Sequence, residues 1–162
     1  MDQSSSVRPY LAWSLVIALI VAGCSSMGGD DKGAKSEAPR TAAPAKAQSV
    51  KVTLSGNSEV PPVQTKATGS GTITVGQDKS VSGSVTTKGV EGTAGHIHDG
   101  APGKNGPVII PLTKNGETWS VPAGSKLTDE QYKNFQAGNL YVNVHSAANK
   151  NGEIRGQLTP GK

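Results

Sequence analysis

Asn139-Leu140-Tyr141-Val142-Asn143-Val144-His145 is the stretch that decides the fold. Its even-numbered side chains are apolar, whereas Tyr141, Asn143 and His145 stand between them. Successive side chains of an extended strand point to opposite faces of a sheet. The stretch therefore predicts a strand with one face in a hydrophobic core and the other face carrying an imidazole, an amide and a phenol.

The residues that follow predict a hairpin with a defined register. Asn151-Gly152 suits a turn because both residues tolerate positive φ, and residues 153–158 alternate as the first strand does. The predicted register pairs the polar residues of the two strands: Tyr141 with Gln157, Asn143 with Arg155 and His145 with Glu153. Arg155 is the only arginine after residue 48, so its position on this face indicates a specific interaction more strongly than an ordinary solvent-exposed charge would.

Alternating segments upstream predict further strands, at residues 50–54, 68–75, 80–87, 93–98, 108–112 and 117–121. Asn115-Gly116 is predicted to join the last two of these segments. Residues 127–138 are the exception, because Thr128 and Gln131 form a capping box that starts one short helix. Together the pattern predicts an all-β, antiparallel, immunoglobulin-like β-sandwich with one short crossover helix.

The N-terminal residues predict export and lipid anchoring. Residues 1–24 resemble a lipoprotein signal peptide, with Arg8 before an apolar run that is shorter than the ~20 residues of a membrane-spanning helix. Val21-Ala22-Gly23-Cys24 resembles a lipobox, so Cys24 is expected to carry acyl chains such as palmitate; the alternatives are an uncleaved anchor or a coincidental cysteine. Residues 25–48 are predicted to be a flexible linker, and residues 49–160 the folded domain.

Composition and motifs exclude several classes of function. The net charge of +4 is spread along the chain without a cluster of basic residues, which argues against a nucleic-acid partner. The sequence contains no nucleophile elbow, phosphate-binding loop or dinucleotide fingerprint. The expected location is the cell envelope, held to the membrane through the lipid: the outer membrane or periplasm of a Gram-negative cell, or the cell surface otherwise.

The three histidines of the chain are the candidate site. His96 and His98, in Gly95-His96-Ile97-His98-Asp99-Gly100, share one strand face, and His145 joins them if the two strands are neighbours. Such a set is a common ligand set for copper or zinc, which Asp99 or Glu153 would complete or orient. The alternative is a structural network that also includes Asn143, in which Arg155 and Glu153 form a charge-assisted pair.

Several motifs in order resemble those of one known family. They are Gly95-His96-Ile97-His98, Pro102-Gly103 with Gly106-Pro107-Val108, the helix that starts after Leu127-Thr128, residues 138–146 and residues 152–158. Over residues 50–158 the chain resembles the CHRD domain, a module repeated in chordin and found singly in bacterial exported proteins. The resemblance implies an immunoglobulin-like sandwich with distant similarity to copper/zinc superoxide dismutase around the His-x-His strand, and it supplies no established enzymatic activity that could be carried over to this chain.

Three functions follow as hypotheses. The first is a non-enzymatic binding module of the envelope that takes a divalent metal such as copper, or an envelope or extracellular protein. The second is a metal-dependent redox or superoxide-detoxifying enzyme at the same histidines, and the third is a purely structural surface lipoprotein. A dismutase-like copper site uses four histidines, so three histidines without further soft ligands favour binding or structure over catalysis.

Overall fold

The computed structural model describes residues 46–161. The predicted signal peptide, Cys24 and the predicted linker up to residue 45 lie outside the described residues. Residues 46–161 belong to one compact unit by their contacts. Within the described part, no helix has both the length and the apolar character needed to cross a membrane.

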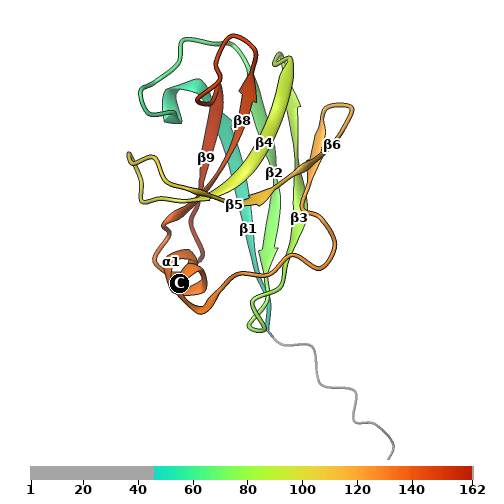
Figure 1. Ribbon diagram of the computed structural model, residues 1–162, viewed down its shortest axis with the longest axis vertical. Coiled ribbons are helices and arrows are strands. Elements are labelled where there is room, and N and C mark those ends of the chain that lie inside the picture. Colours follow the sequence, from blue (N-terminus) through green and yellow to red (C-terminus); the bar gives the residue numbers. More distant parts are fainter. Residues whose placement is uncertain (1–45, 162) are drawn as a thin grey trace, which may run out of the picture. The chain divides into compact units, whose positions relative to one another are not determined.

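The described chain forms strands, one short α-helix and one turn of 3-10 helix (Figure 1). In chain order the elements are β1 (Gln48–Ser55), η1 (Gly56–Ser58), β2 (Thr68–Val75), β3 (Val81–Lys88), β4 (Gly92–Asp99), β5 (Val108–Pro111), β6 (Thr113–Asn115), β7 (Thr118–Ser120), α1 (Asp129–Gln136), β8 (Leu140–Ser146) and β9 (Ile154–Leu158). Every pair of neighbouring strands is antiparallel. The predicted all-β antiparallel fold with one short helix is confirmed.

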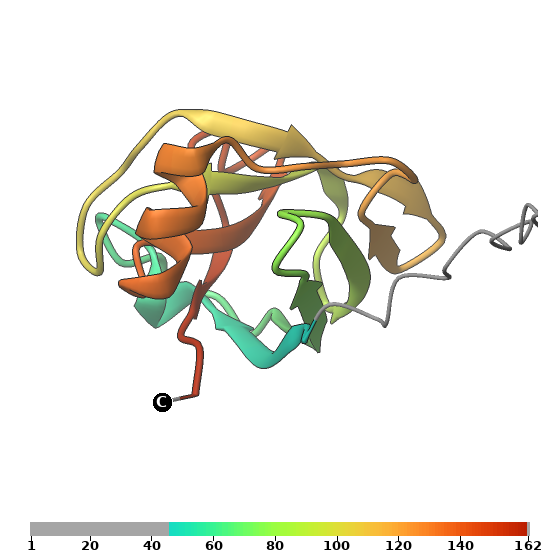
Figure 2. The same ribbon diagram turned by 90° about the horizontal axis from the view of Figure 1, so that it is seen from below.

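The strands form one hydrogen-bonded sheet in the order β5-β4-β8-β9-β1-β2-β3-β7-β6. The ladder narrows to a single register pair, Ser55 with Arg155, between β9 and β1. The sheet bends there, so that β4, β8 and β9 lie across the core from β2 and β3, and it nearly closes on itself (Figure 2). The interior is filled by apolar side chains from both halves, among them Leu54, Ile73, Val85, Ile97, Val142, Val144 and Ile154, each at most 1% exposed.

The register of the last hairpin agrees with the predicted one. β8 and β9 pair Tyr141 with Gln157 and Asn143 with Arg155, while their apolar neighbours face the core. The predicted pair of His145 with Glu153 is not part of this ladder. Instead the Glu153 N–H donates to the Val144 carbonyl at 2.8 Å.

The hairpin predicted between residues 108–112 and 117–121 is wrong. Asn115-Gly116 does form a tight turn, but the turn joins β6 to β7, whereas β5 pairs with β4. After β5 the chain stays beside β4 as far as Leu112, whose N–H donates to the Gly95 carbonyl. It then crosses to the opposite half of the sheet, where β6 and β7 lie. A turn signal of two residues specifies the reversal but not how far the paired strands extend.

The predicted helix forms with the predicted cap. Thr128 accepts a hydrogen bond from the Gln131 N–H at 3.2 Å and its own N–H donates to the Gln131 side chain at 2.9 Å. Phe135 is fully buried and anchors the helix to the core. The helix leads directly into β8, and therefore fixes where the strand that carries His145 begins.

Candidate metal centre

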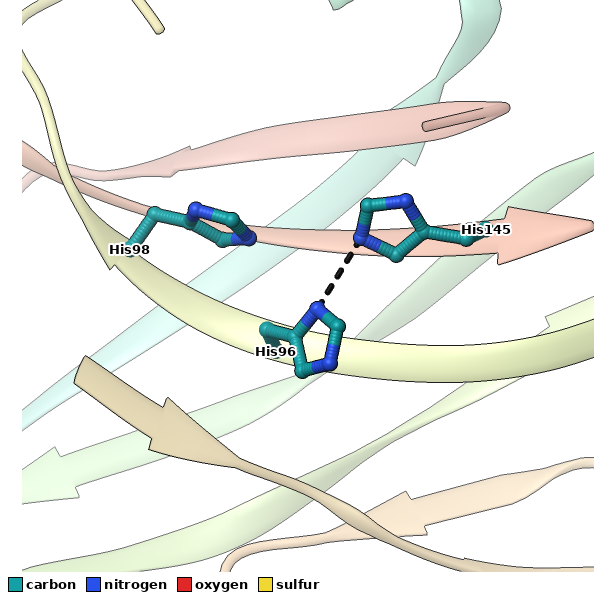
Figure 3. A group of neighbouring side chains, drawn as sticks. All are labelled: His96, His98 and His145. Atoms are coloured by element: carbon teal, nitrogen blue, oxygen red, sulfur yellow. Dashed lines mark hydrogen bonds between the residues drawn. The ribbon is translucent and has the colours of Figure 1, made fainter. Parts of the chain in front are cut away.

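The pairing of β4 with β8 brings the three imidazoles together. The register places His96 opposite Asn143, His98 opposite Tyr141 and Ala94 opposite His145. Because Ile97 points into the core, its two histidine neighbours lie on the outer face of the sheet, as does His145. Figure 3 shows the three rings directed toward one point from the two strands. These residues are called the imidazole cluster below.

The distances within the imidazole cluster are close to those of a metal site. His96 Nδ1 lies 3.0 Å from His145 Nε2, and one ring nitrogen of each histidine lies within 4.8 Å of the others. Two imidazole nitrogens bound to one metal at ~2.0–2.1 Å are at most about 4.1 Å apart. Binding one metal ion therefore requires the longest separation to shrink by at least about 0.7 Å, which rotations of the rings would supply.

Two loop carbonyls fix the tautomers of the cluster. His98 Nδ1 lies 2.9 Å from the Gly106 carbonyl, and His145 Nδ1 lies 2.9 Å from the Lys150 carbonyl. A carbonyl oxygen only accepts, so both Nδ1 atoms carry the proton and both Nε2 atoms carry a lone pair. Without a metal, His96 Nδ1–H then donates to His145 Nε2. Such carbonyl contacts behind an imidazole are the usual arrangement that orients a metal ligand.

The lone pair of His98 Nε2 has no hydrogen-bond donor. The side chain is only 7% exposed, and Nε2 is one of three buried side-chain atoms in residues 46–161 that lack a partner. Leaving a buried polar atom without a partner costs about 1–3 kcal/mol. In Figure 3 the His98 ring presents a nitrogen toward the His145 ring. A cation between the rings would supply the missing partner.

Burial and neighbouring imidazoles keep His96 and His98 in the neutral form that can bind a metal. Burial lowers the pKa of His96, and the neighbouring His145 and His98 lower it further. Burial also lowers the pKa of His98, against the opposing effect of the Gly106 carbonyl. Since both pKa values fall below the ordinary 6.5, these imidazoles are neutral at pH 7, and only a neutral imidazole binds a metal.

Arg155 has a structural role beside the cluster. It is 1% exposed and donates to the carbonyls of Ala101 and Lys104, at 3.3 and 2.9 Å. Its guanidinium lies 3.4 Å from the centre of the Tyr141 ring, and the Tyr141 ring stacks on His98 with 4.7 Å between centroids. Arg155 thus holds the 100–107 loop over the outer face of the sheet, and that loop supplies the Gly106 carbonyl to His98.

The two carboxylates named with the histidines are held elsewhere. Asp99 accepts from the Asn134 amide of α1, with both oxygens at 3.0 Å. Glu153 accepts from the Thr65 hydroxyl at 2.8 Å. In the part of the chain that the structure describes, the group of possible metal ligands that includes the histidines contains neither carboxylate. The three nitrogens therefore form the ligand set by themselves.

The expected ion pair between Arg155 and Glu153 is wrong. Among the ion pairs of residues 46–161, none joins these two side chains. Arg155 is drawn to the carbonyls of the 100–107 loop, which the hairpin pattern of the sequence does not reveal. Glu153 lies just outside the paired part of β9 and turns toward Thr65.

Sequence reasoning missed Glu59. This residue follows η1, is 4% exposed, and burial raises the pKa of its carboxyl while Arg155 acts in the opposite direction. Its segment, Glu59-Val60-Pro61-Pro62, has no periodicity, so no local pattern marks the carboxyl as buried. Its one distinguishing feature is its position near Arg155, the only arginine of the domain. Only the three-dimensional structure reveals this position.

The fold and the site define a class of protein: a small antiparallel β domain that carries three converging imidazoles on the outer face of its sheet. The chain belongs to the CHRD domain family, whose sequence model matches residues 50–158. This match confirms the family suggested by the motifs. No curated protein and no solved structure matches the chain.

Proposed function

We propose that this chain is a lipid-anchored protein of the bacterial cell envelope whose CHRD domain binds a divalent metal ion through the imidazole cluster. The ligand atoms are His96 Nδ1, His98 Nε2 and His145 Nε2. The observation that carries the proposal is the buried His98 Nε2 lone pair, which has no partner and belongs to a histidine that offers a ring nitrogen within 4.8 Å of one from each of the other two. It acts as a binding module, because three histidines without further soft ligands favour binding over catalysis.

The ligand set favours copper or zinc. Imidazole nitrogens suit these borderline-soft metals, and a set without carboxylates or several carbonyl oxygens does not suit calcium or magnesium. For a given nitrogen site the intrinsic affinity for Cu(II) exceeds that for Zn(II), so copper is the preferred ion. Three protein ligands leave a coordination position for water or for a group of a partner molecule.

Calorimetric titration of the purified protein with Cu(II) and Zn(II) tests the metal site. We expect one ion per chain and at least about a tenfold loss of affinity when His96, His98 and His145 are all changed to Ala. Asp99→Asn is the matched control, because this neighbouring carboxylate is held by Asn134 and should not contribute to binding. Absence of binding to the unmodified protein, or equal binding to the triple variant, would exclude the proposal.

A structural role for the same histidines is the second candidate, and the carbonyl contacts of His98 and His145 favour it. These contacts tie the 100–107 loop and the loop after β8 to the sheet. If this is their sole role, the triple Ala variant loses stability while metal ions leave the melting temperature of the unmodified protein unchanged. If the metal site exists, saturating metal raises that temperature, because a ligand bound only by the folded state stabilises it.

We propose Cys24 as the lipid attachment point. A residue that carries two acyl chains is enough to hold a protein stably at a membrane. Expression in a Gram-negative cell with a palmitate analogue that can be labelled tests this directly. We expect the label and the membrane-bound protein to disappear together in Cys24→Ser. Labelled Cys24→Ser protein, or unmodified protein without label, would contradict the anchor.

A further inference from the structure

Three buried side-chain atoms lack hydrogen-bond partners, and one of them belongs to the imidazole cluster. They are His98 Nε2, Asn143 Oδ1 and Glu59 Oε1, and residues 46–161 contain no other such side-chain atom. Burial raises the pKa of Glu59 and lowers the pKa of His98, and the Asn143 side chain opposes both effects, which places the amide beside both groups. Because these neighbouring atoms all lack hydrogen-bond partners, one change in the hydrogen bonding could satisfy all of them.

Gly152 shows how tightly the Glu59 and Asn143 side chains are packed. A Cβ at that position would lie 2.7 Å from Asn143 Nδ2 and would also collide with Glu59 Oε1. Both atoms therefore face the Gly152 backbone, and the amide nitrogen is on the Glu59 side of Asn143. In this orientation the amide oxygen meets no donor.

A half-turn of the Asn143 amide and one proton satisfy all three atoms. The half-turn exchanges the amide oxygen and nitrogen with almost no change in shape, so Nδ2–H can donate to the lone pair of His98 Nε2. The amide oxygen then faces Glu59, which can donate to it only when the carboxyl is protonated, because a carboxylate has no hydrogen. The second arrangement therefore belongs to a neutral Glu59.

We propose that Glu59 and Asn143 are positioning residues that link metal binding at the imidazole cluster to the release of one proton from Glu59. The inference rests on the proposed metal site. Without metal, the Glu59 O–H donates to Asn143 Oδ1 and Asn143 N–H donates to His98 Nε2. When a metal ion bonds to His98 Nε2, that hydrogen bond breaks and the amide turns. Its N–H then donates to a Glu59 carboxylate, whose proton passes to water.

The surroundings of Glu59 suit this exchange. Burial, the largest influence, raises the pKa of the carboxyl and so favours the proton, whereas Arg155 of β9 and the Val60 N–H favour the carboxylate. A cavity of about 220 Å³ between Glu59 and the loop after β8 gives the proton a path to solvent. Lys150 lines the same cavity and is the other charged residue that borders it. The positive charge of a bound metal shifts the balance further toward the carboxylate.

The difference in proton count between the unmodified protein and Glu59→Gln isolates Glu59, because a water molecule bound to zinc at the open position would lose its proton in both proteins. His96 changes tautomer when its Nδ1 becomes a ligand, but the proton that leaves Nδ1 is replaced by one on the outward Nε2, so this shift releases nothing. Calorimetry with Zn(II) at pH 7.5, in buffers of different ionisation enthalpy, measures the protons released by the purified full-length protein. We expect the unmodified protein to release more protons per zinc ion than Glu59→Gln, by as much as one.

Glu59→Gln keeps the volume and a donor for Asn143 Oδ1 but has no proton to lose. Glu153→Gln is the matched control, since it removes a nearby carboxylate that is bound to Thr65, and it should release as many protons as the unmodified protein. If zinc binds and Glu59→Gln releases an unchanged number of protons, the link to Glu59 is refuted while the metal site stands. If zinc does not bind at all, the proposed function itself fails.

A spectroscopic measurement covers the case in which Glu59→Gln does not fold. The infrared carbonyl band of a buried protonated carboxyl should be present in the metal-free unmodified protein and should disappear on zinc binding. Absence of that band before zinc is added, or its persistence at saturation, would refute the proposal.

Discussion

Arg155→Met tests whether the 100–107 loop is part of the metal centre. The substitution keeps a long apolar side chain but removes the donors to the Ala101 and Lys104 carbonyls and the guanidinium over the Tyr141 ring. Each carbonyl that loses its donor costs about 1–3 kcal/mol, and the lost stacking adds roughly 1 kcal/mol. Removing the buried charge of Arg155 recovers a few kcal/mol of desolvation free energy. We expect a net loss of about 2–4 kcal/mol in the free energy of unfolding.

Equilibrium unfolding in urea measures this loss, and hydrogen exchange locates it. Amides of the 100–107 loop should exchange faster in Arg155→Met, while those of β2 and β3 exchange at their original rates under native conditions. Zinc affinity should fall as well, because the loop carbonyl of Gly106 orients His98. Lys51→Met, which removes an exposed charge from β1, is the control and should change none of these values. A loss below about 1 kcal/mol with unchanged loop exchange would refute the reasoning.

Four further variants test the stability of the fold. Gly152→Ala should cost more than about 2 kcal/mol in a urea titration, since its Cβ would collide with two buried polar side chains at a φ of 126°. Gly103→Ala, with φ 73° and open space around it, should cost about 1 kcal/mol. Because burial lowers the pKa of His96 and His98, their contribution to metal-free stability is present above pH 6.5 and is lost as the pH falls through the lowered values; His96→Gln should lose less stability over that interval than the unmodified protein. Thr128→Ala should cost about 1 kcal/mol through loss of the helix cap and leave zinc affinity unchanged, and a change in zinc affinity would contradict the separation of helix and site.

The convergence of the histidines could be predicted because it depends on local alternation and on strand pairing. In β8 and β9, the buried apolar residues admit one register, since a slip by one residue would turn all of them to solvent. That register placed Asn143 beside Arg155 as observed. His96 and His98 then needed only one further condition, the pairing of β4 with β8, which the structure fulfils.

The surroundings of the histidines could not be predicted because they come from loops. Alternation assigns a side chain to a face of the sheet, but it does not say which backbone groups cover that face. Arg155 meets carbonyls of a loop about fifty residues earlier in the chain, at Ala101 and Lys104. Glu59 comes from a proline-containing segment without a pattern, so neither its burial nor its place behind Asn143 has a local signal.

The structural and the metal-binding interpretations of the cluster share most of their contacts. The carbonyls that tie His98 and His145 to their loops stabilise the loops, and the same carbonyls leave the Nε2 lone pairs free. They therefore do not distinguish the two functions. The partner of His98 Nε2 does distinguish them, because this buried atom gains about 1–3 kcal/mol from whichever group satisfies it. A metal ion returns that energy directly, and a turned Asn143 amide returns it in the metal-free protein. The occupant of this one lone pair is thus what decides between a structural network and a metal centre.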